Sequence, residues 1–274
     1  MIALALLAAT APTLWAPAPV SSPMFESHTA FDPLNGDFYF VRSNTNFRGW
    51  RILVSRCRRG GWQAPVDAPF AGDGVEADPA FADNGRTLWF ISSRTSDGVR
   101  GRGLDIWTVA RGADGAWATP VRLPEPVNSA GNEWFPRLGR DGWLYFGSDR
   151  PGGLGRTDIW RARRGADGHW TAENAGPALN SGGDEYEPLI TPDGARMLLM
   201  TAEGYFESRL TSAGWSPRTR LGSGINADSG EIGAVFSPSG RSFLFSRDLH
   251  GERSGEFMLA GPAERNWPPA CPRR

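Results

Sequence analysis

Glutamate and arginine side chains recur along the chain in a pattern that could bind a ligand or perform acid–base chemistry. Four glutamates stand about 50 residues apart, a spacing typical of internal repeats. They are Glu76, Glu133, Glu185 and Glu231. Charged residues follow in the same stretches, namely Arg94, Asp149, Arg150 and Arg247. Several carboxylates together suit Ca²⁺, and a pair suits glycoside hydrolysis. The competing interpretation is structural: each repeated glutamate accepts hydrogen bonds from loop amides or pairs with a neighbouring arginine.

The chain contains few residues or motifs that would support other kinds of catalysis. All the positive charge is arginine, so lysine-based covalent catalysis is excluded. The three histidines, His28, His169 and His250, are too scattered for a zinc site, and no Gly-x-Ser-x-Gly or His-Glu-x-x-His motif occurs. A catalytic pair should break the repeat, so the better enzyme candidates are the carboxylates outside the pattern: Glu203, Glu207 and Glu252. The net charge of −1 gives no overall attraction to nucleic acid or anionic membranes.

Short strands are the elements that would carry these side chains. The clearest unit, residues 133–170, contains a tight turn at Asp141-Gly142 and an aromatic strand at 143–148. A glycine-rich loop at 149–156 separates that strand from another at 158–163. With the segments at its two ends, the unit predicts four antiparallel strands joined by three turns.

Weaker copies of this unit fill most of the remaining sequence. Each copy has a turn glycine followed by an aromatic or apolar strand: Gly36, Gly85, Gly142, Gly194 and Gly240. Each ends on a tryptophan at the start of the expected fourth strand: Trp62, Trp117, Trp170, Trp215 and Trp267. Four strands per repeat at this period indicate the blades of a β-propeller. We therefore expect an all-β fold, a single β-propeller of four-stranded antiparallel blades over residues 24–274, with five blades and a sixth left open.

The landmarks of the clearest unit resemble the WD-repeat-like propeller repeat of the TolB type. They are Glu-x-x-Pro at Glu133, Asp-Gly at Asp141, the run LYFGSDRPGGLG from Leu144, and Asp-Ile-Trp at Asp158. The second repeat has the same Asp-Ile-Trp at Asp105, and the other three match more weakly. The resemblance implies a propeller fold and a bacterial periplasmic location, but no particular reaction. Rings of that family commonly have six or more blades, whereas this chain offers five repeats.

Strand order distributes the loops between two faces of such a ring. In a four-stranded antiparallel blade, the loop after strand two and the connection after strand four emerge on the same side. The loop 149–156 and the connections before the repeated glutamates therefore share one face, and the Asp-Gly turns lie on the other. We expect the first face to form a polar mouth of the central channel, suited to a peptide or glycan.

The N-terminus and the two cysteines predict an exported protein. Residues 2–11 form an apolar run too short to span a bilayer, and they are similar to the hydrophobic region of a signal peptide. We assign residues 1–23 to this signal and a proline-rich leader; the piece that begins at Trp15 could also add an outer strand to the last blade. An even number of cysteines favours a disulfide in an exported protein. Cys57 and Cys271 would be neighbours only if the ring closes, and the alternative is two unrelated thiols.

The sequence thus predicts an exported, periplasmic or extracellular, non-enzymatic β-propeller. It would bind an envelope protein or glycan through its channel-mouth face, with no membrane span and no nucleic-acid partner. One alternative is a carbohydrate-active hydrolase or lyase that uses carboxylates at the same mouth. Another is a structural ring whose partner is a second subunit. No cofactor is expected beyond the Ca²⁺ that the glutamates could hold, and the oligomeric state stays open.

Overall fold

Turn glycines and buried apolar segments divide the chain into short antiparallel strands. The computed structural model describes residues 11–96, 103–227, 230–250 and 255–271. The five glycines expected at the first turn of each repeat all have a positive φ, between 70° and 87°. Glycine adopts this conformation without steric cost, so the prediction of tight turns at these positions is confirmed.

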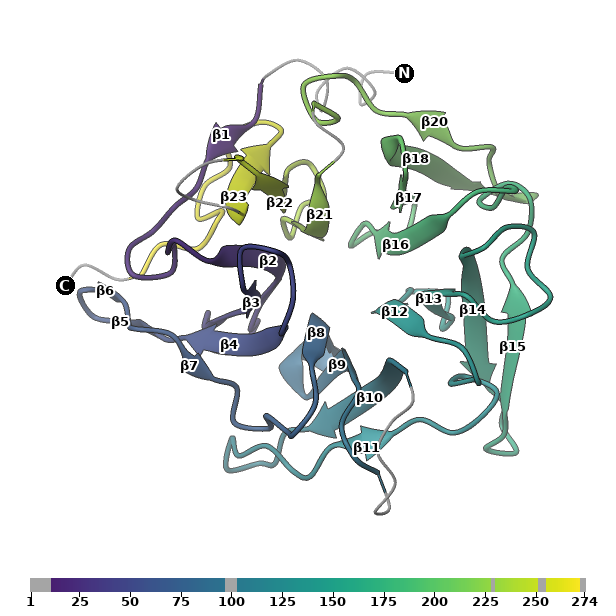
Figure 1. Ribbon diagram of the computed structural model, residues 1–274, viewed down its shortest axis with the longest axis horizontal. Coiled ribbons are helices and arrows are strands. Elements are labelled where there is room, and N and C mark those ends of the chain that lie inside the picture. Colours follow the sequence, from purple (N-terminus) through teal and green to yellow (C-terminus); the bar gives the residue numbers. More distant parts are fainter. Residues whose placement is uncertain (1–10, 97–102, 228–229, 251–254, 272–274) are drawn as a thin grey trace.

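Five antiparallel groups of strands surround a central axis (Figure 1). The first group contains β2 (Phe25–Phe31), β3 (Phe38–Ser43), β4 (Arg51–Ser55) and β7 (Val66–Asp67), with a small hairpin of β5 (Cys57–Arg58) and β6 (Gly61–Trp62). The second contains β8 (Glu76–Ala82), β9 (Thr87–Ser92), β10 (Asp105–Ala110) and β11 (Val121–Arg122), with the short 3-10 turn η2 (Asp83–Gly85). The third contains β12 (Glu133–Leu138), β13 (Leu144–Ser148), β14 (Asp158–Arg164) and β15 (Trp170–Asn174).

The fourth and fifth groups complete the arrangement. The fourth contains β16 (Glu185–Ile190), β17 (Arg196–Thr201), β18 (Gly204–Thr211), β19 (Gly214–Trp215) and β20 (Thr219–Arg220). The fifth contains β21 (Ile232–Phe236), β22 (Phe243–Asp248) and β23 (Gly255–Ala260). The first strand of each group lies nearest the centre of the ring (Figure 1). The fold is therefore all-β and β-propeller-like, built from four-stranded antiparallel sheets.

Residues near the N-terminus supply the outer strand of the fifth group. β1 (Thr13–Leu14) pairs with β23, and the amide of Trp15 donates to the carbonyl of Phe257 at 2.8 Å. This segment lies within the stretch that the sequence assigned to a leader. An outer strand on the last group was expected from the piece that begins at Trp15, and the paired residues are Thr13 and Leu14, directly before it. One parallel contact, between Phe25 and Gly255, then joins the fifth group to the first.

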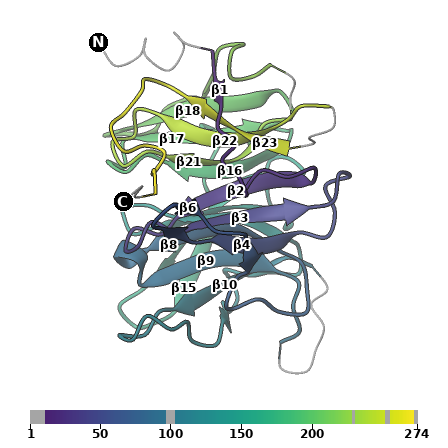
Figure 2. The same ribbon diagram turned by 90° about the vertical axis from the view of Figure 1, so that its left-hand side faces the viewer.

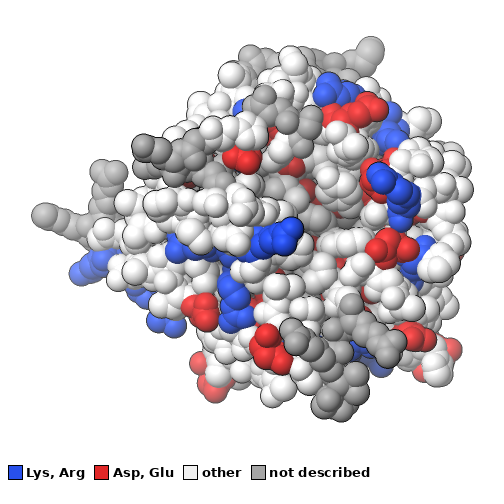
Figure 3. Space-filling view, in the orientation of Figure 1, with Lys and Arg blue, Asp and Glu red and all other residues white. Residues whose placement is uncertain are grey.

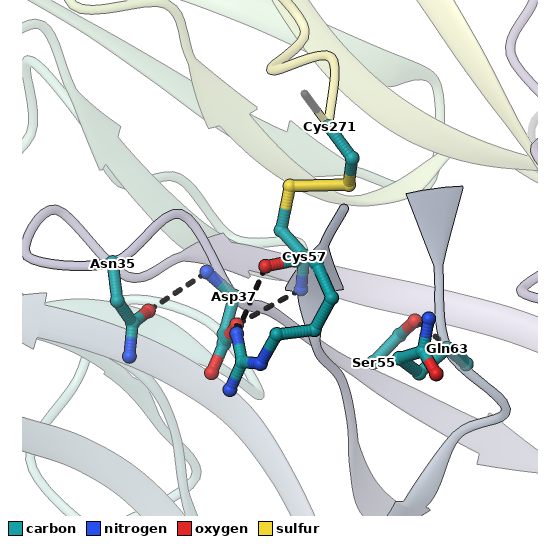
Figure 4. Close-up of a disulfide and its surroundings, with 7 residues drawn as sticks. Asn35, Asp37, Ser55, Cys57, Gln63 and Cys271 are labelled. Carbon is teal, nitrogen blue, oxygen red and sulfur yellow. Dashed lines mark hydrogen bonds and ion pairs between the residues drawn. A yellow bond between two sulfur atoms is a disulfide. The ribbon is translucent and has the colours of Figure 1, made fainter. Parts of the chain in front are cut away.

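A disulfide connects the same two groups (Figure 4). Cys57 lies in the β5–β6 hairpin and Cys271 lies after β23, with a Cα–Cα distance of 5.2 Å. The Asp37 carboxylate holds the hairpin by accepting hydrogen bonds from the Cys57 amide and the Arg58 guanidinium, both at 2.9 Å. The disulfide therefore joins the first and last sheets of the ring covalently.

Three of the repeat tryptophans lie before the outer strand instead of opening it. Trp62 is in β6, Trp215 is in β19, and Trp117 forms only a bridge with Arg111, whereas Trp170 does open β15. The indole N–H groups explain two of these positions. Trp117 donates to the Tyr39 hydroxyl and Trp215 to the Tyr145 hydroxyl, both at 3.2 Å and both in the preceding sheet. A buried indole needs such a partner, so these tryptophans tie neighbouring sheets together.

Figure 2 shows the strands of the ring from the side. Apolar side chains fill the spaces between the sheets. The second strands contribute most of the fully buried aromatic rings, which include Phe38, Phe40, Phe90, Phe146 and Phe243. In the part of the chain that the structure describes, no helix is long and apolar enough to cross a membrane.

Removal of the disulfide should loosen the ring. The bond joins residues 214 positions apart, and releasing a constraint on so long a loop costs about 3–5 kcal/mol of unfolding free energy. We expect the Cys57→Ser/Cys271→Ser double variant to lose about this amount in equilibrium denaturation, and reduced wild-type protein to behave in the same way. Equal stability of the oxidised and reduced wild-type proteins would contradict this role.

Candidate functional site

The repeated glutamates are buried at the start of the innermost strands. Glu76, Glu133, Glu185 and Glu231 have exposed fractions of 0–2%. The connection before each strand donates hydrogen bonds to the carboxylate; for example, Ser129 and Ser181 donate hydroxyls to Glu133 and Glu185 at 2.6 Å. Burial raises the pKa of Glu133, against hydrogen bonds from Ser129 and the charge of Arg150, which lower it. These carboxylates are therefore occupied within the scaffold.

Each of these glutamates also pairs with an arginine. The pairs are Glu76–Arg94, Glu133–Arg150 at 2.9 Å, Glu185–Arg218 at 2.8 Å and Glu231–Arg247 at 3.0 Å, and Glu26 pairs with Arg42 in the same way at 2.7 Å. Aromatic rings cover the guanidinium groups; Arg150, for example, lies 5.0 Å from the centres of both Phe146 and Trp160. The arginines Arg94, Arg150 and Arg247 that the sequence placed on the channel-mouth face thus stabilise the sheets from within.

The remaining predicted residues fall in different places. Asp149 is exposed and accepts hydrogen bonds from the amide and side chain of Asn132 at 2.6 and 2.8 Å. Glu207 pairs with Arg209, and Glu203 lies in the tight turn between β17 and β18. Glu252 lies outside the described residues. Within the described ranges, no group of three or more His, Cys, Asp or Glu side chains is placed to hold a metal ion.

A second position on each innermost strand escaped the sequence analysis. Two residues after the repeated glutamate, every innermost strand has an irregular register and a residue with positive φ. The φ values are 50° at His28, 58° at Asp78, 50° at Phe135, 56° at Glu187 and 71° at Gly233. Non-glycine residues adopt this conformation only where their surroundings hold them, and such residues gather at functional sites.

A cavity of about 490 Å³ lies at the mouth of the central channel, on the face where the innermost strands begin. Its walls combine residues of the innermost strands with the loops after strand two, as the strand order predicted for this face. The aromatic side chains in its wall are Phe47, Trp50, Trp134, Phe135 and Tyr186, and the polar ones include His28, Asp78, Asp149, Arg156 and Asp184. Figure 3 shows the hollow at the centre of the ring, with acidic atoms at its depth.

His28 and Asp78 form a buried pair at the base of this cavity. His28 Nε2 lies 3.2 Å from Asp78 Oδ1, and the other Asp78 oxygen accepts the Phe135 amide at 2.7 Å. The imidazole is stacked between Phe47 and Phe135, with ring centres 5.9 and 5.2 Å away. Burial lowers the pKa of His28 to about 3 and raises the pKa of Asp78 to about 7. The cavity base is therefore a neutral imidazole beside a carboxyl group that holds its proton to near neutral pH.

Glu187 lies on β16, the innermost strand of the fourth group, and is fully buried. Its Oε1 accepts the Ala234 amide at 2.6 Å and the Tyr205 hydroxyl at 2.7 Å. Burial raises the pKa of Glu187. Its carboxyl group does not line the cavity at the channel mouth.

One signal in the sequence could have identified these residues. The position two residues after the repeated glutamate reads His, Asp, Phe, Glu and Gly in the five repeats, so it varies while the glutamate itself is constant. A position that varies within a constant frame is where a symmetrical ring acquires an asymmetrical site.

Comparisons with known proteins concern the fold. No protein-family model matches the chain, and no curated protein matches its sequence. The catalytic domain of the GH62 α-L-arabinofuranosidase from Coprinopsis cinerea matches with a TM-score of 0.54 at 10% identity, over 92% of this chain and 96% of that one. A protein described as TolB from Agrobacterium tumefaciens matches with a TM-score of 0.50 at 15% identity, over 88% and 84%.

The match to a xylan β-1,4-xylosidase from Bacillus halodurans is partial. It covers 89% of this chain, which spans 54% of the length of that protein, with a TM-score of 0.48 at 17% identity. At these identities the comparisons support a distant structural similarity to β-propeller proteins, TolB among them. They assign no reaction, because similar rings carry unrelated activities.

Truncation of Arg150 should destabilise the fold because it leaves the buried Glu133 carboxylate without its charge partner. The Arg150 side chain is 8% exposed, and breaking a buried pair costs about 3 kcal/mol or more. Arg156, whose side chain is 81% exposed in its pair with Asp184, is the matched control and should cost less than about 1 kcal/mol. Chemical denaturation of Arg150→Ala and Arg156→Ala compares the two, and equal losses would contradict a scaffold role for Arg150.

His28 should stay neutral across the physiological range and contribute a defined pH dependence. Its pKa is about 3 in the folded chain against the ordinary value of 6.5 for a histidine, so the unfolded state takes up the proton first. The stability that His28 contributes is complete above pH 6.5 and is lost as the pH falls toward 3. Ring-carbon NMR, with His28→Gln and His169→Gln to assign the signals, should show no titration of His28 near pH 6.5. A midpoint near 6.5 would overturn this description.

Proposed function

We propose that the chain is an exported, five-bladed β-propeller that binds a cell-envelope glycan in the cavity at the channel mouth. The observation that carries this proposal is the asymmetry of the cavity wall. Aromatic side chains from separate sheets line this cavity together with a few carboxylates and one arginine. The glutamates that repeat in every sheet are buried instead. Ligand sites are typically concave and largely apolar, with a small number of polar groups that fix orientation.

The lining suits a saccharide in particular. A pyranose presents C–H faces that pack on aromatic rings, and Trp50, Trp134 and Tyr186 are partly exposed in the cavity wall. Its hydroxyl groups need hydrogen-bond acceptors and donors at the edge, and Asp184 and Arg156 supply both. An indole or phenol ring provides large apolar area together with a polar edge, which suits such an amphipathic ligand.

Two further observations support the remaining parts of the proposal. The five antiparallel groups around one axis fit a five-bladed ring that β1 and the disulfide close. The Cys57–Cys271 bond favours export, because disulfides persist in oxidising compartments.

The carboxyl groups in and near this cavity suit the binding of a glycan better than its hydrolysis. A glycosidase needs two carboxyl groups on opposite sides of the scissile bond. Asp78 faces the cavity, but one of its oxygens accepts the Phe135 amide and the other lies against His28 Nε2, and the nearby Glu187 is fully buried. The alternative is a carbohydrate-active hydrolase or lyase. It is favoured by the raised pKa of Asp78, a property of general acids, and by the fold-level likeness to an arabinofuranosidase.

The cavity aromatics should decide glycan affinity. We expect soluble peptidoglycan fragments or arabino- and xylo-oligosaccharides to bind the wild-type chain, and Trp134→Ala and Tyr186→Ala to weaken that binding about tenfold, or 1.4 kcal/mol each. Trp143→Ala is the matched control, since Trp143 packs against Arg161 and Arg163 and does not line the cavity. Isothermal titration measures the affinities.

The outcomes separate the two candidate functions. Loss of affinity in both cavity variants, with no new reducing ends after prolonged incubation, supports binding. Turnover that Asp78→Asn abolishes favours the hydrolase. Absence of binding to every glycan, or an unchanged affinity in Trp134→Ala, contradicts the proposal.

A further inference from the structure

The opposite mouth of the channel contains a second cavity, which is mostly apolar. Its volume is about 600 Å³, and all five innermost strands contribute to it at their C-terminal ends. Its walls include Phe31, Phe81, Leu189, Val235 and Phe236, with several prolines. This volume and lining are in the range of pockets that enclose a small organic molecule.

One cation, Arg137 of β12, reaches this apolar cavity from the channel interior. The residue is 9% exposed and lines the cavity. Its Nη1 donates to the backbone carbonyls of Pro136 at 3.0 Å and Asp78 at 3.4 Å. Among the described residues, its Nε and Nη2 find no acceptor and no carboxylate lies within 4.0 Å, in contrast to the pairs of Arg94 and Arg150. Arg137 is thus a buried cation without an anionic partner.

Two buried carboxyl groups, those of Asp78 and Glu187, act on Arg137 by their charge, but their closest contacts are with other residues. Asp78 contacts His28 and the Phe135 amide, and Glu187 accepts hydrogen bonds from Tyr205 and the Ala234 amide. Burial raises the pKa of both groups, so each holds its proton more tightly than an exposed carboxyl group does. Their charges act on the guanidinium from a distance, but neither carboxyl group forms an ion pair with Arg137.

We propose that this second cavity binds a small-molecule carboxylate with an apolar body, with the carboxylate on Arg137 and the body against the aromatic and aliphatic walls. A guanidinium with two unused donor nitrogens matches the two oxygens of a carboxylate. An anion would also supply the charge that burial of Arg137 leaves uncompensated. Arg140, exposed at the rim, adds a second positive charge on the same side.

The site is independent of the glycan cavity, because the two share no lining residue. A polar ligand such as a glycan would find few hydrogen-bond partners between Phe31, Phe81 and Phe236. Asp83 at the rim accepts a hydrogen bond from the Thr87 hydroxyl at 3.0 Å and keeps its negative charge, so the lining carries two cations, Arg137 and Arg140, against one carboxylate.

Three matched probes test the proposal on the whole chain: phenylacetate, phenylacetamide and acetate. Titration calorimetry should detect phenylacetate at millimolar concentration or below, with phenylacetamide at least about tenfold weaker because it lacks the charge, and acetate undetected because it lacks the body. Trp134→Ala, at the other mouth, should leave phenylacetate affinity unchanged. Equal binding of the acid and the amide, or no binding of the acid, would overturn the proposal.

Variants at the two arginines locate the binding. Arg137→Gln should weaken phenylacetate at least about tenfold while phenylacetamide is unaffected. If that variant does not fold, Arg140→Glu, an exposed change at the rim, should weaken the acid about threefold or more through charge reversal. Wild-type affinity in a folded Arg137→Gln protein, or in Arg140→Glu where Arg137→Gln cannot be measured, contradicts the assignment.

Discussion

A buried glutamate that pairs with an arginine is the interaction on which the position of each sheet in the ring depends. The carboxylate stands at or next to the start of an innermost strand and accepts hydrogen bonds from the connection that enters the sheet. An arginine from the same sheet supplies the opposite charge, as Arg150 does for Glu133. Five such pairs fix the inner ends of the five groups. Because a buried unpaired charge is costly, the glutamate and the arginine depend on each other for stability.

This constraint also explains where the asymmetry of the ring lies. Once the glutamate fixes the start of the strand, the bulge two residues later brings a residue with positive φ to the channel. That residue is not needed for the pairing, so it can differ from sheet to sheet. His28, Asp78 and Phe135 meet there as an imidazole, a carboxyl group and an aromatic ring in contact. A repeated frame thus positions side chains that do not repeat.

The sequence predicted the frame well because the frame is local. Turn glycines and aromatic second strands depend on residues close together in the chain, and the loops that share a face follow from strand order alone. The role of the repeated glutamates depends instead on burial, which the sequence does not report. In the fourth group the position that Arg150 has in the third, two residues after the partner of the repeated glutamate, is occupied by Glu203, and Arg218 from the outer edge supplies the cation instead. The His28–Asp78 contact and the isolation of Arg137 need the closed ring, so no pattern along the chain predicts them.

The two mouths of the channel differ in chemistry although one set of strands forms both. One combines aromatic rings with carboxylates, and the other surrounds a single buried guanidinium with apolar walls. Both depend on residues that depart from the repeat, Asp78 and Arg137, which touch through the Asp78 carbonyl. The scaffold therefore keeps two cavities of different chemistry apart within one channel.

Hydrogen–deuterium exchange with and without a soluble envelope glycan tests the central claim most directly. The claim is that function resides in the side chains that break the repeat at the channel mouth. The account predicts protection by the glycan in the peptides that contain Phe47 and Trp50, Trp134 and Phe135, and Asp184 to Glu187, with little change at the Asp-Gly turns. Protection confined to the outer strands or to the opposite face, or no protection at all, would contradict it.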